Sequence, residues 1–164
     1  MQFDVAVIGG GPAGSSAAIT AARAGLRVML VEKGPYGRNK VCGDGLTPRA
    51  IAALDELKID HSVAHRIDGL RMMAGKTQRE LAWPTTSRFP NHGAVWPRQK
   101  FDNHLLDVAI ASGAEVRFES EALPVLDGDR VTGVQVGSEV INASLVILAT
   151  GAQGAAAKML GAVR

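Results

Sequence analysis

A glycine-rich turn near the start of the chain places the strongest limit on how it can fold. The apolar run at residues 5–8 leads into Gly9-Gly10-Gly11-Pro12-Ala13-Gly14, and an alanine-rich segment follows. This order predicts a strand, a tight turn and a helix, with Gly9, Gly11 and Gly14 at the positions of a dinucleotide-binding G-x-G-x-x-G motif. The N–H groups at the helix N-terminus, where Pro12 and Ala13 stand, would then face a diphosphate.

The segment that follows completes a β-α-β unit. Gly25 ends the predicted helix, residues 27–31 form a second strand, and Glu32 stands 18 residues after Gly14. An acidic residue at a spacing of about 20 commonly binds the ribose of the dinucleotide. The Glu32 carboxylate would accept hydrogen bonds from the ribose hydroxyls and disfavour a 2′-phosphate. The alternative is that Glu32 is only a solvated strand end.

The rest of the chain alternates helices and strands. Apolar residues recur at helical spacing at residues 48–57 and between Arg98 and Gly113. Strands are predicted at residues 70–73, 80–83, 114–118, 122–126, 131–136 and 140–149, of which 144–149 should be buried. The predicted fold class is therefore α/β, a Rossmann-like domain with a parallel sheet and a β-hairpin crossover.

Composition limits the classes of function. The net charge is only +2 and the basic residues are scattered, so nucleic acid is not an expected partner. Cys42 is the single cysteine and the histidines lack paired ligand spacing, so we expect no disulfide within the chain and no metal site. The sequence shows no signal peptide and no apolar stretch long enough to span a bilayer, which favours a cytoplasmic location.

Three segments carry a resemblance to known flavoproteins. Residues 98–102, Arg-Gln-Lys-Phe-Asp, and residues 149–151, Ala-Thr-Gly, resemble two motifs of p-hydroxybenzoate-hydroxylase-like enzymes. Cys42-Gly43-Asp44-Gly45, followed by Pro48-Arg49, is similar to the motif of the geranylgeranyl reductase family. Those enzymes saturate isoprenoid double bonds in archaeal lipids, chlorophyll side chains and menaquinone. The resemblance implies that the dinucleotide is FAD, whereas the glycine turn alone is equally compatible with NAD.

The resemblance implies roles for residues at the adenosine half of FAD. Glu32 and Lys33 would flank the ribose, and the backbone at Ala122 would meet the adenine edge. Arg98 would reach the phosphate or the ribityl chain. The remaining contacts to the diphosphate and the adenosine half would come from Gly9, Gly11, Pro12, Ala13, Gly14, Thr150 and Gly151.

At the flavin end, Cys42, Gly43 and Asp44 would approach the isoalloxazine and the substrate. Cys42 and Asp44 are the candidate catalytic residues. The alternative for Cys42 is that it is only a small buried cysteine, and the alternative for Asp44 is that it only forms a turn.

The activity that the resemblance implies is the reduction of a prenyl double bond. NAD(P)H or ferredoxin would reduce FAD, hydride would pass to one carbon of the double bond, and a proton would reach the other. A flavin monooxygenase or halogenase of the same superfamily is one alternative. A nucleotide-binding fragment without catalysis is the other.

Because members of the family are considerably longer, we expect residues 1–164 to be an incomplete FAD-binding domain of a larger flavoprotein. Residues 69–97 would supply the first strands of a substrate-domain sheet that this chain leaves truncated. Unpaired strands there predict self-association. The full-length protein is expected to act on a prenyl lipid or another apolar molecule and to contact a membrane peripherally.

Overall fold

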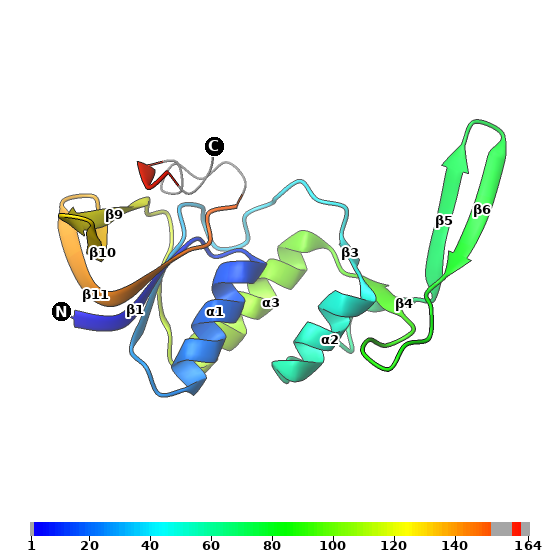
Figure 1. The fold of residues 1–164 in the computed structure, drawn as a ribbon, viewed down its shortest axis with the longest axis horizontal. Coiled ribbons are helices and arrows are strands. Elements are labelled where there is room, and N and C mark those ends of the chain that lie inside the picture. The colour runs from blue at the N-terminus through cyan, green and yellow to red at the C-terminus, as the bar shows by residue number, and fades with distance from the viewer. Residues whose placement is uncertain (1, 152–158, 162–164) are drawn as a thin grey trace. The chain divides into compact units, whose positions relative to one another are not determined.

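The computed structural model describes residues 2–151 and 159–161, and it divides the chain into two compact units (Figure 1). Unit 1 comprises residues 1–38 and 102–164, and unit 2 comprises residues 39–101. Each unit has its own sheet or sheets.

The described part of unit 1 is built on a six-stranded sheet with the order β8-β2-β1-β11-β10-β9. The strands are β1 (Gln2–Ile8), β2 (Val28–Val31), β8 (Glu115–Arg117), β9 (Ala122–Asp127), β10 (Arg130–Val136) and β11 (Glu139–Leu148). The first four in the sheet order are parallel to one another, and β11 continues into an antiparallel meander with β10 and β9. The α/β fold class and the hairpin crossover predicted from the sequence are therefore confirmed.

Helix α1 (Pro12–Arg23) connects β1 to β2 and covers them. Proline is tolerated in its first turn because that N–H has no partner within the helix. The buried positions are Gly14, Ser15, Ala18, Ile19 and Ala22. The alanine-rich segment therefore buries Ala18 and Ala22 together with Ile19, whereas Ala17 and Ala21 are only half-buried.

The prediction that residues 144–149 are buried is wrong. Ser144 is exposed, Leu145 is 54% exposed, and the residues from Val146 to Ala149 are half-buried. Leu145 pairs in register with Val5, which is only 3% exposed. The two strands differ because α1 packs more extensively on β1 and β2 than on β11.

Unit 2 contains a small antiparallel sheet and a helix. The sheet has the order β3-β7-β4 and consists of β3 (Gly45–Leu46), β7 (Gly93–Val95) and β4 (His65–Ile67). Helix α2 (Pro48–Glu56) begins after Thr47, whose hydroxyl accepts a 3.3 Å hydrogen bond from the N–H of Ala50. Helix α3 (Arg98–Ala111) has its first residues in unit 2 and the rest in unit 1.

A separate two-stranded ribbon completes unit 2 and is drawn in green in Figure 1. It consists of β5 (Gly69–Ala74) and β6 (Thr77–Ala82), joined at Gly75-Lys76. Almost every residue of the ribbon is exposed. Trp83, predicted to end the second strand, follows β6 instead, whereas Trp96 is buried and packs on Phe101 with ring centroids 5.2 Å apart.

Candidate cofactor-binding site

The glycine turn of unit 1 packs directly on the chain that follows β11. A Cβ placed on Gly9 would lie 2.5 Å from the carbonyl oxygen of Ala149, and one on Gly14 would lie 1.8 Å from the carbonyl oxygen of Gly9. Gly9 also has φ +107°, which L side chains rarely adopt. The structure therefore brings the predicted Ala-Thr-Gly segment, with Thr150 at its centre, against the glycine turn.

Gly11 is open where Gly9 and Gly14 are crowded. Among residues 2–151 and 159–161, apart from its chain neighbours, a Cβ on Gly11 would have only the Nη2 atom of Arg38 within 4 Å, at 3.7 Å. Gly11 is the N-cap of α1 and provides no side-chain cap, so the N–H groups of the first turn are not satisfied by a capping side chain. An accessible turn at a helix N-terminus fits a diphosphate group.

Glu32 lies beside this turn and is nearly fully buried, with 4% of its surface exposed. Its Oε2 accepts a 2.6 Å hydrogen bond from the N–H of Gly10, and its Oε1 accepts one of 2.9 Å from the N–H of Gly34. The Nε atom of Arg38 lies 3.1 Å from Oε1. Glu32 is therefore not a solvated strand end, and its carboxylate is anchored to the glycine turn, a contact that the sequence did not predict.

The other residues predicted at the adenosine half have separate positions. Lys33 is exposed next to Glu32. Ala122 begins β9 and buries its side chain in the sheet core near Val134, which leaves its backbone as the group predicted to meet adenine. The chain just before β9 lies against the Glu32 segment, since the N–H of Ser120 donates to the carbonyl of Glu32 at 3.1 Å. The roles of Glu32, Lys33 and Ala122 toward adenosine remain predictions.

Unit 2 brings together the residues predicted at the flavin end with Arg98. Oδ1 of Asp44 accepts a 2.9 Å hydrogen bond from the backbone N–H of Arg98, the first residue of α3. The carbonyl of Asp44 accepts another of 2.9 Å from the N–H of Trp96. Asp44 itself has φ +50°, an uncommon conformation for a residue other than glycine. Asp44 thus fixes the loop to the start of α3, a structural role that the sequence did not reveal.

Cys42 is exposed, so the alternative of a small buried cysteine is wrong. A hydrogen bond with the Arg98 side chain lowers the pKa of the Cys42 thiol, and the backbone N–H groups of Gly43 and Asp44 act in the same direction. Burial opposes this effect only in part. The guanidinium therefore stabilises a thiolate, which makes Cys42 able to give up its proton more readily than an ordinary cysteine.

Arg38 is the site residue that sequence reasoning missed. It follows Glu32 in a polar, glycine-rich loop with no periodic pattern, so nothing local distinguishes it from the exposed basic residues of the chain. Asp102, the last residue of the Arg-x-x-Phe-Asp segment, is 3% exposed and lies 3.7 Å from Nη2 of Arg38. The buried Glu32 and Asp102 form a charge cluster beside the glycine turn with Arg38, which is half-buried.

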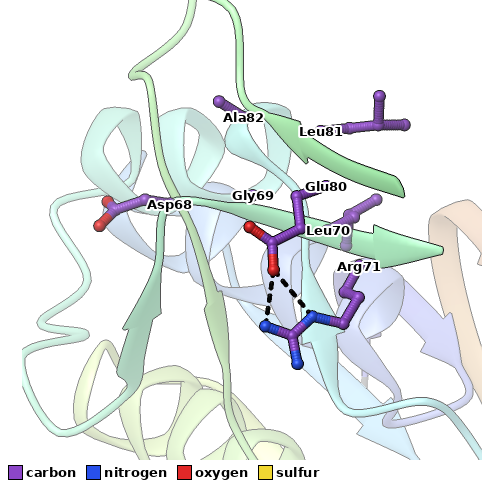
Figure 2. A pocket seen from close by; sticks show the side chains of 7 residues that line it. All are labelled: Asp68, Gly69, Leu70, Arg71, Glu80, Leu81 and Ala82. Atoms are coloured by element: carbon purple, nitrogen blue, oxygen red, sulfur yellow. Dashed lines mark hydrogen bonds and ion pairs between the residues drawn. The ribbon is translucent and has the colours of Figure 1, made fainter. Parts of the chain in front are cut away.

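Two other features lie outside this candidate site. A hollow of about 540 Å³ at the base of the β5–β6 ribbon contains none of the predicted site residues (Figure 2). Arg71 and Glu80 form an ion pair across it, with 2.6 Å between Nη2 and Oε1.

Among residues 2–151 and 159–161, no group of His, Cys, Asp and Glu side chains is arranged to hold a metal ion. In the same part of the chain, no helix is both long and apolar enough to cross a bilayer.

Comparison with known proteins identifies the cofactor of the protein. The sequence pattern of the FAD dependent oxidoreductase family matches residues 4–162. The chain belongs to this family. FAD is accordingly the dinucleotide of this flavoprotein, and the open turn at Gly11 beside an anchored Glu32 fits its ADP half. Gly11, the start of α1 and Glu32 would hold that half. Cys42 is predicted to approach the isoalloxazine, and Arg98 the phosphate or the ribityl chain.

The flavoprotein resembles both reductases and halogenases. It is 37% identical to the menaquinone reductase of Mycolicibacterium smegmatis over 98% of its own length, and it spans 40% of that protein. A geranylgeranyl bacteriochlorophyll reductase-like protein from Thermoplasma acidophilum superimposes with a TM-score of 0.74 at 33% identity, covering 90% of this chain and 39% of that one. The myxobacterial chondrochloren halogenase superimposes with a TM-score of 0.77 at 26% identity, covering 94% and 38%.

Proposed function

We propose that this flavoprotein reduces carbon–carbon double bonds of an isoprenoid substrate. The observation that carries the proposal is the 37% identity to a menaquinone reductase across nearly the whole chain. The Cys42-Gly43-Asp44-Gly45 loop supports it, because this loop resembles the geranylgeranyl reductase motif. The substrate is a prenyl lipid, which favours peripheral contact of the full-length protein with a membrane. Residues 69–97 are proposed to begin the substrate-domain sheet.

When bound and reduced by NAD(P)H or ferredoxin, FAD supplies a hydride to one carbon of the double bond. The other carbon needs a proton, and we assign its delivery to the Cys42 thiol. A general acid is most effective when its pKa lies near the working pH, and Arg98 lowers the pKa of Cys42 in that direction. After the proton leaves, the Arg98 guanidinium stabilises the thiolate, which regains a proton from water before the next turnover.

A second candidate function is oxygen-dependent halogenation or hydroxylation. It is favoured by the structural similarity to the chondrochloren halogenase. It is disfavoured by the lower identity of that comparison than of those with the reductases. A third candidate is FAD binding without turnover by this chain, which spans only 40% of its reductase relative.

The test is a product assay with the purified protein loaded with FAD. Dithionite-reduced protein is mixed without oxygen with menaquinone or with a geranylgeranyl lipid, and the products are analysed by mass spectrometry. We expect a product heavier by two hydrogens, and less of it with Cys42→Ser at unchanged FAD content. A halogenated or hydroxylated product in the presence of oxygen and halide would favour the second candidate. Bound FAD without any product would favour the third candidate, which is FAD binding without turnover.

A further inference from the structure

We propose that Arg38 is a cofactor-binding residue whose guanidinium contacts the diphosphate of FAD and offsets the two buried carboxylates beside it. The proposal rests on the assignment of FAD to the glycine turn of unit 1. It adds a third cation to the two that the sequence predicts near the cofactor, which are Lys33 at the ribose and Arg98 at the phosphate or the ribityl chain.

The first observation is the charge arrangement. Glu32 and Asp102 are 4% and 3% exposed, and Arg38 lies between them, 3.1 Å from Oε1 of Glu32 and 3.7 Å from Oδ2 of Asp102. The cluster therefore has two negative groups and one positive group. A diphosphate brings further negative charge to the same place, and charges in a weakly solvated region repel each other more strongly than in water. Without the guanidinium, the cluster would oppose the ligand that the glycine turn is built to bind.

The second observation is the direction in which Arg38 points. Its Nη2 atom lies 3.7 Å from the position that a Cβ on Gly11 would take, which is the open side of the turn. The Arg38 side chain is 21% exposed, whereas those of Glu32 and Asp102 are 6% and 4% exposed. The partly exposed guanidinium thus reaches the side of the turn where a phosphate approaches the backbone, while its Nη2 also donates a 3.4 Å hydrogen bond to Oε2 of Glu32. Its planar set of N–H donors suits phosphate oxygens.

The third observation is that the loop holds Arg38 in this position. A Cβ on Gly34 would lie 2.6 Å from Cδ of Arg38, so the glycine leaves the space that the arginine stem occupies. The N–H of Gly37 donates to Oδ1 of Asn103 at 3.1 Å, and the Tyr36 hydroxyl donates to the Asp107 carboxylate at 2.9 Å. These contacts tie the loop to the part of α3 that belongs to unit 1. Arg38 is consequently placed before any ligand contact is made.

The experiment compares ligands that differ only in phosphate. Dissociation constants of FAD, ADP and adenosine are measured by calorimetry for the wild type, Arg38→Met and Arg38→Lys, with the exposed Arg130→Met as the matched control. We expect Arg38→Met to weaken ADP and FAD roughly tenfold or more, because a hydrogen bond to a charged group is lost. Adenosine should change less than about twofold, Arg38→Lys should retain part of the ADP affinity, and Arg130→Met should match the wild type.

Equal losses for adenosine and ADP would overturn the proposal, since Arg38 would then act only by holding Glu32. Unchanged ADP affinity in Arg38→Met would overturn it as well. If Arg38→Met does not fold, the same comparison is made in Arg38→Met/Asp102→Asn, which removes one buried charge and should still bind ADP more weakly than the wild type. A folded wild-type protein that binds neither FAD nor ADP would instead contradict the cofactor site itself.

Discussion

The backbone N–H of Gly10 donates a 2.6 Å hydrogen bond to the buried carboxylate of Glu32. This contact joins the glycine turn after β1 to the end of β2, two segments that meet only because the strands are parallel neighbours. A hydrogen bond to a charged acceptor is stronger than one between neutral groups. Glu32 is therefore a structural support of the turn as well as the predicted ribose ligand.

Replacing Glu32 should destabilise the fold according to how many of its contacts are lost. Glu32→Ala leaves the N–H groups of Gly10 and Gly34 without their acceptor and Arg38 with one carboxylate fewer, so we expect a loss of about 3–5 kcal/mol in the free energy of unfolding. Glu32→Gln retains one acceptor oxygen and should lose less. The measurement is urea denaturation, with the exposed Glu121→Ala as the control. A loss in Glu32→Ala no larger than in the control would contradict the role assigned to Glu32.

The sequence was sufficient for the β1-α1-β2 unit because every signal there is local. Glycines mark the turns, the strands are short apolar runs, and Glu32 stands at the expected spacing. The small strands β3 and β4 could not be predicted, since they are two and three residues long and exist only through pairing with β7. Leu145 was misjudged for a related reason. Its exposure depends on which strands α1 covers, and that is a property of the packed structure.

The candidate site likewise contains residues that the sequence predicts and residues that only the folded chain brings together. The glycines and Glu32 were identified from a motif with fixed spacing, and their contacts to one another agree with it. Arg38 and Asp102 are far apart in the sequence and belong to no common pattern, so only the folded chain shows that they meet. The hydrogen bond from the N–H of Arg98 to Asp44 could not be predicted from the sequence either, because the two residues are also far apart in it. Each residue by itself was a predicted site residue.

Two glycine substitutions should separate folding from cofactor binding. Gly14→Ala would place a Cβ 1.8 Å from a backbone oxygen, so the turn and α1 must move apart. We expect Gly14→Ala to lose about 1–3 kcal/mol or more of stability and most of its soluble yield. Gly11→Ala has space and an ordinary φ of −77°, so its stability should change by less than about 1 kcal/mol.

Gly11→Ala should nevertheless bind FAD more weakly, because its methyl group occupies the side of the turn that the diphosphate approaches. Stability is measured by urea denaturation and FAD affinity by quenching of flavin fluorescence. Unchanged FAD affinity in a folded Gly11→Ala protein would show that the diphosphate does not contact this turn.

The pH dependence of Cys42 alkylation should report its contact with Arg98. Since Arg98 lowers the pKa of the thiol, the thiolate forms at lower pH than in an ordinary cysteine, and iodoacetamide should react faster at neutral pH than it does with a model peptide. Arg98→Met should move the midpoint of the rate profile upward. Arg79→Met, an exposed arginine on β6, serves as the control and should leave the midpoint in place. Identical midpoints for Arg98→Met and the wild type would rule out the contact.

The β5–β6 ribbon should promote self-association of this chain. Leu70, Met72 and Leu81 are 47%, 58% and 48% exposed. Leu70 pairs with Leu81, and Met72 lies two residues along the same strand, so all three share one face of the ribbon. Within the described residues no third strand pairs with β5 or β6. An exposed apolar face on such a two-stranded sheet favours pairing with another strand. We expect the average mass of the wild type to rise with concentration in sedimentation velocity runs.

Charged substitutions on that face should reduce the association. Met72→Lys and Leu81→Lys place a charge on the apolar face, and lysine on an edge strand disfavours pairing between chains. Both variants should shift toward the monomer, whereas Ile110→Lys, which changes a residue of 46% exposure on α3, should behave like the wild type. Urea denaturation checks that the variants keep their stability. A wild type that stays monomeric at all concentrations, or an equal effect of Ile110→Lys, would exclude the ribbon as the contact surface.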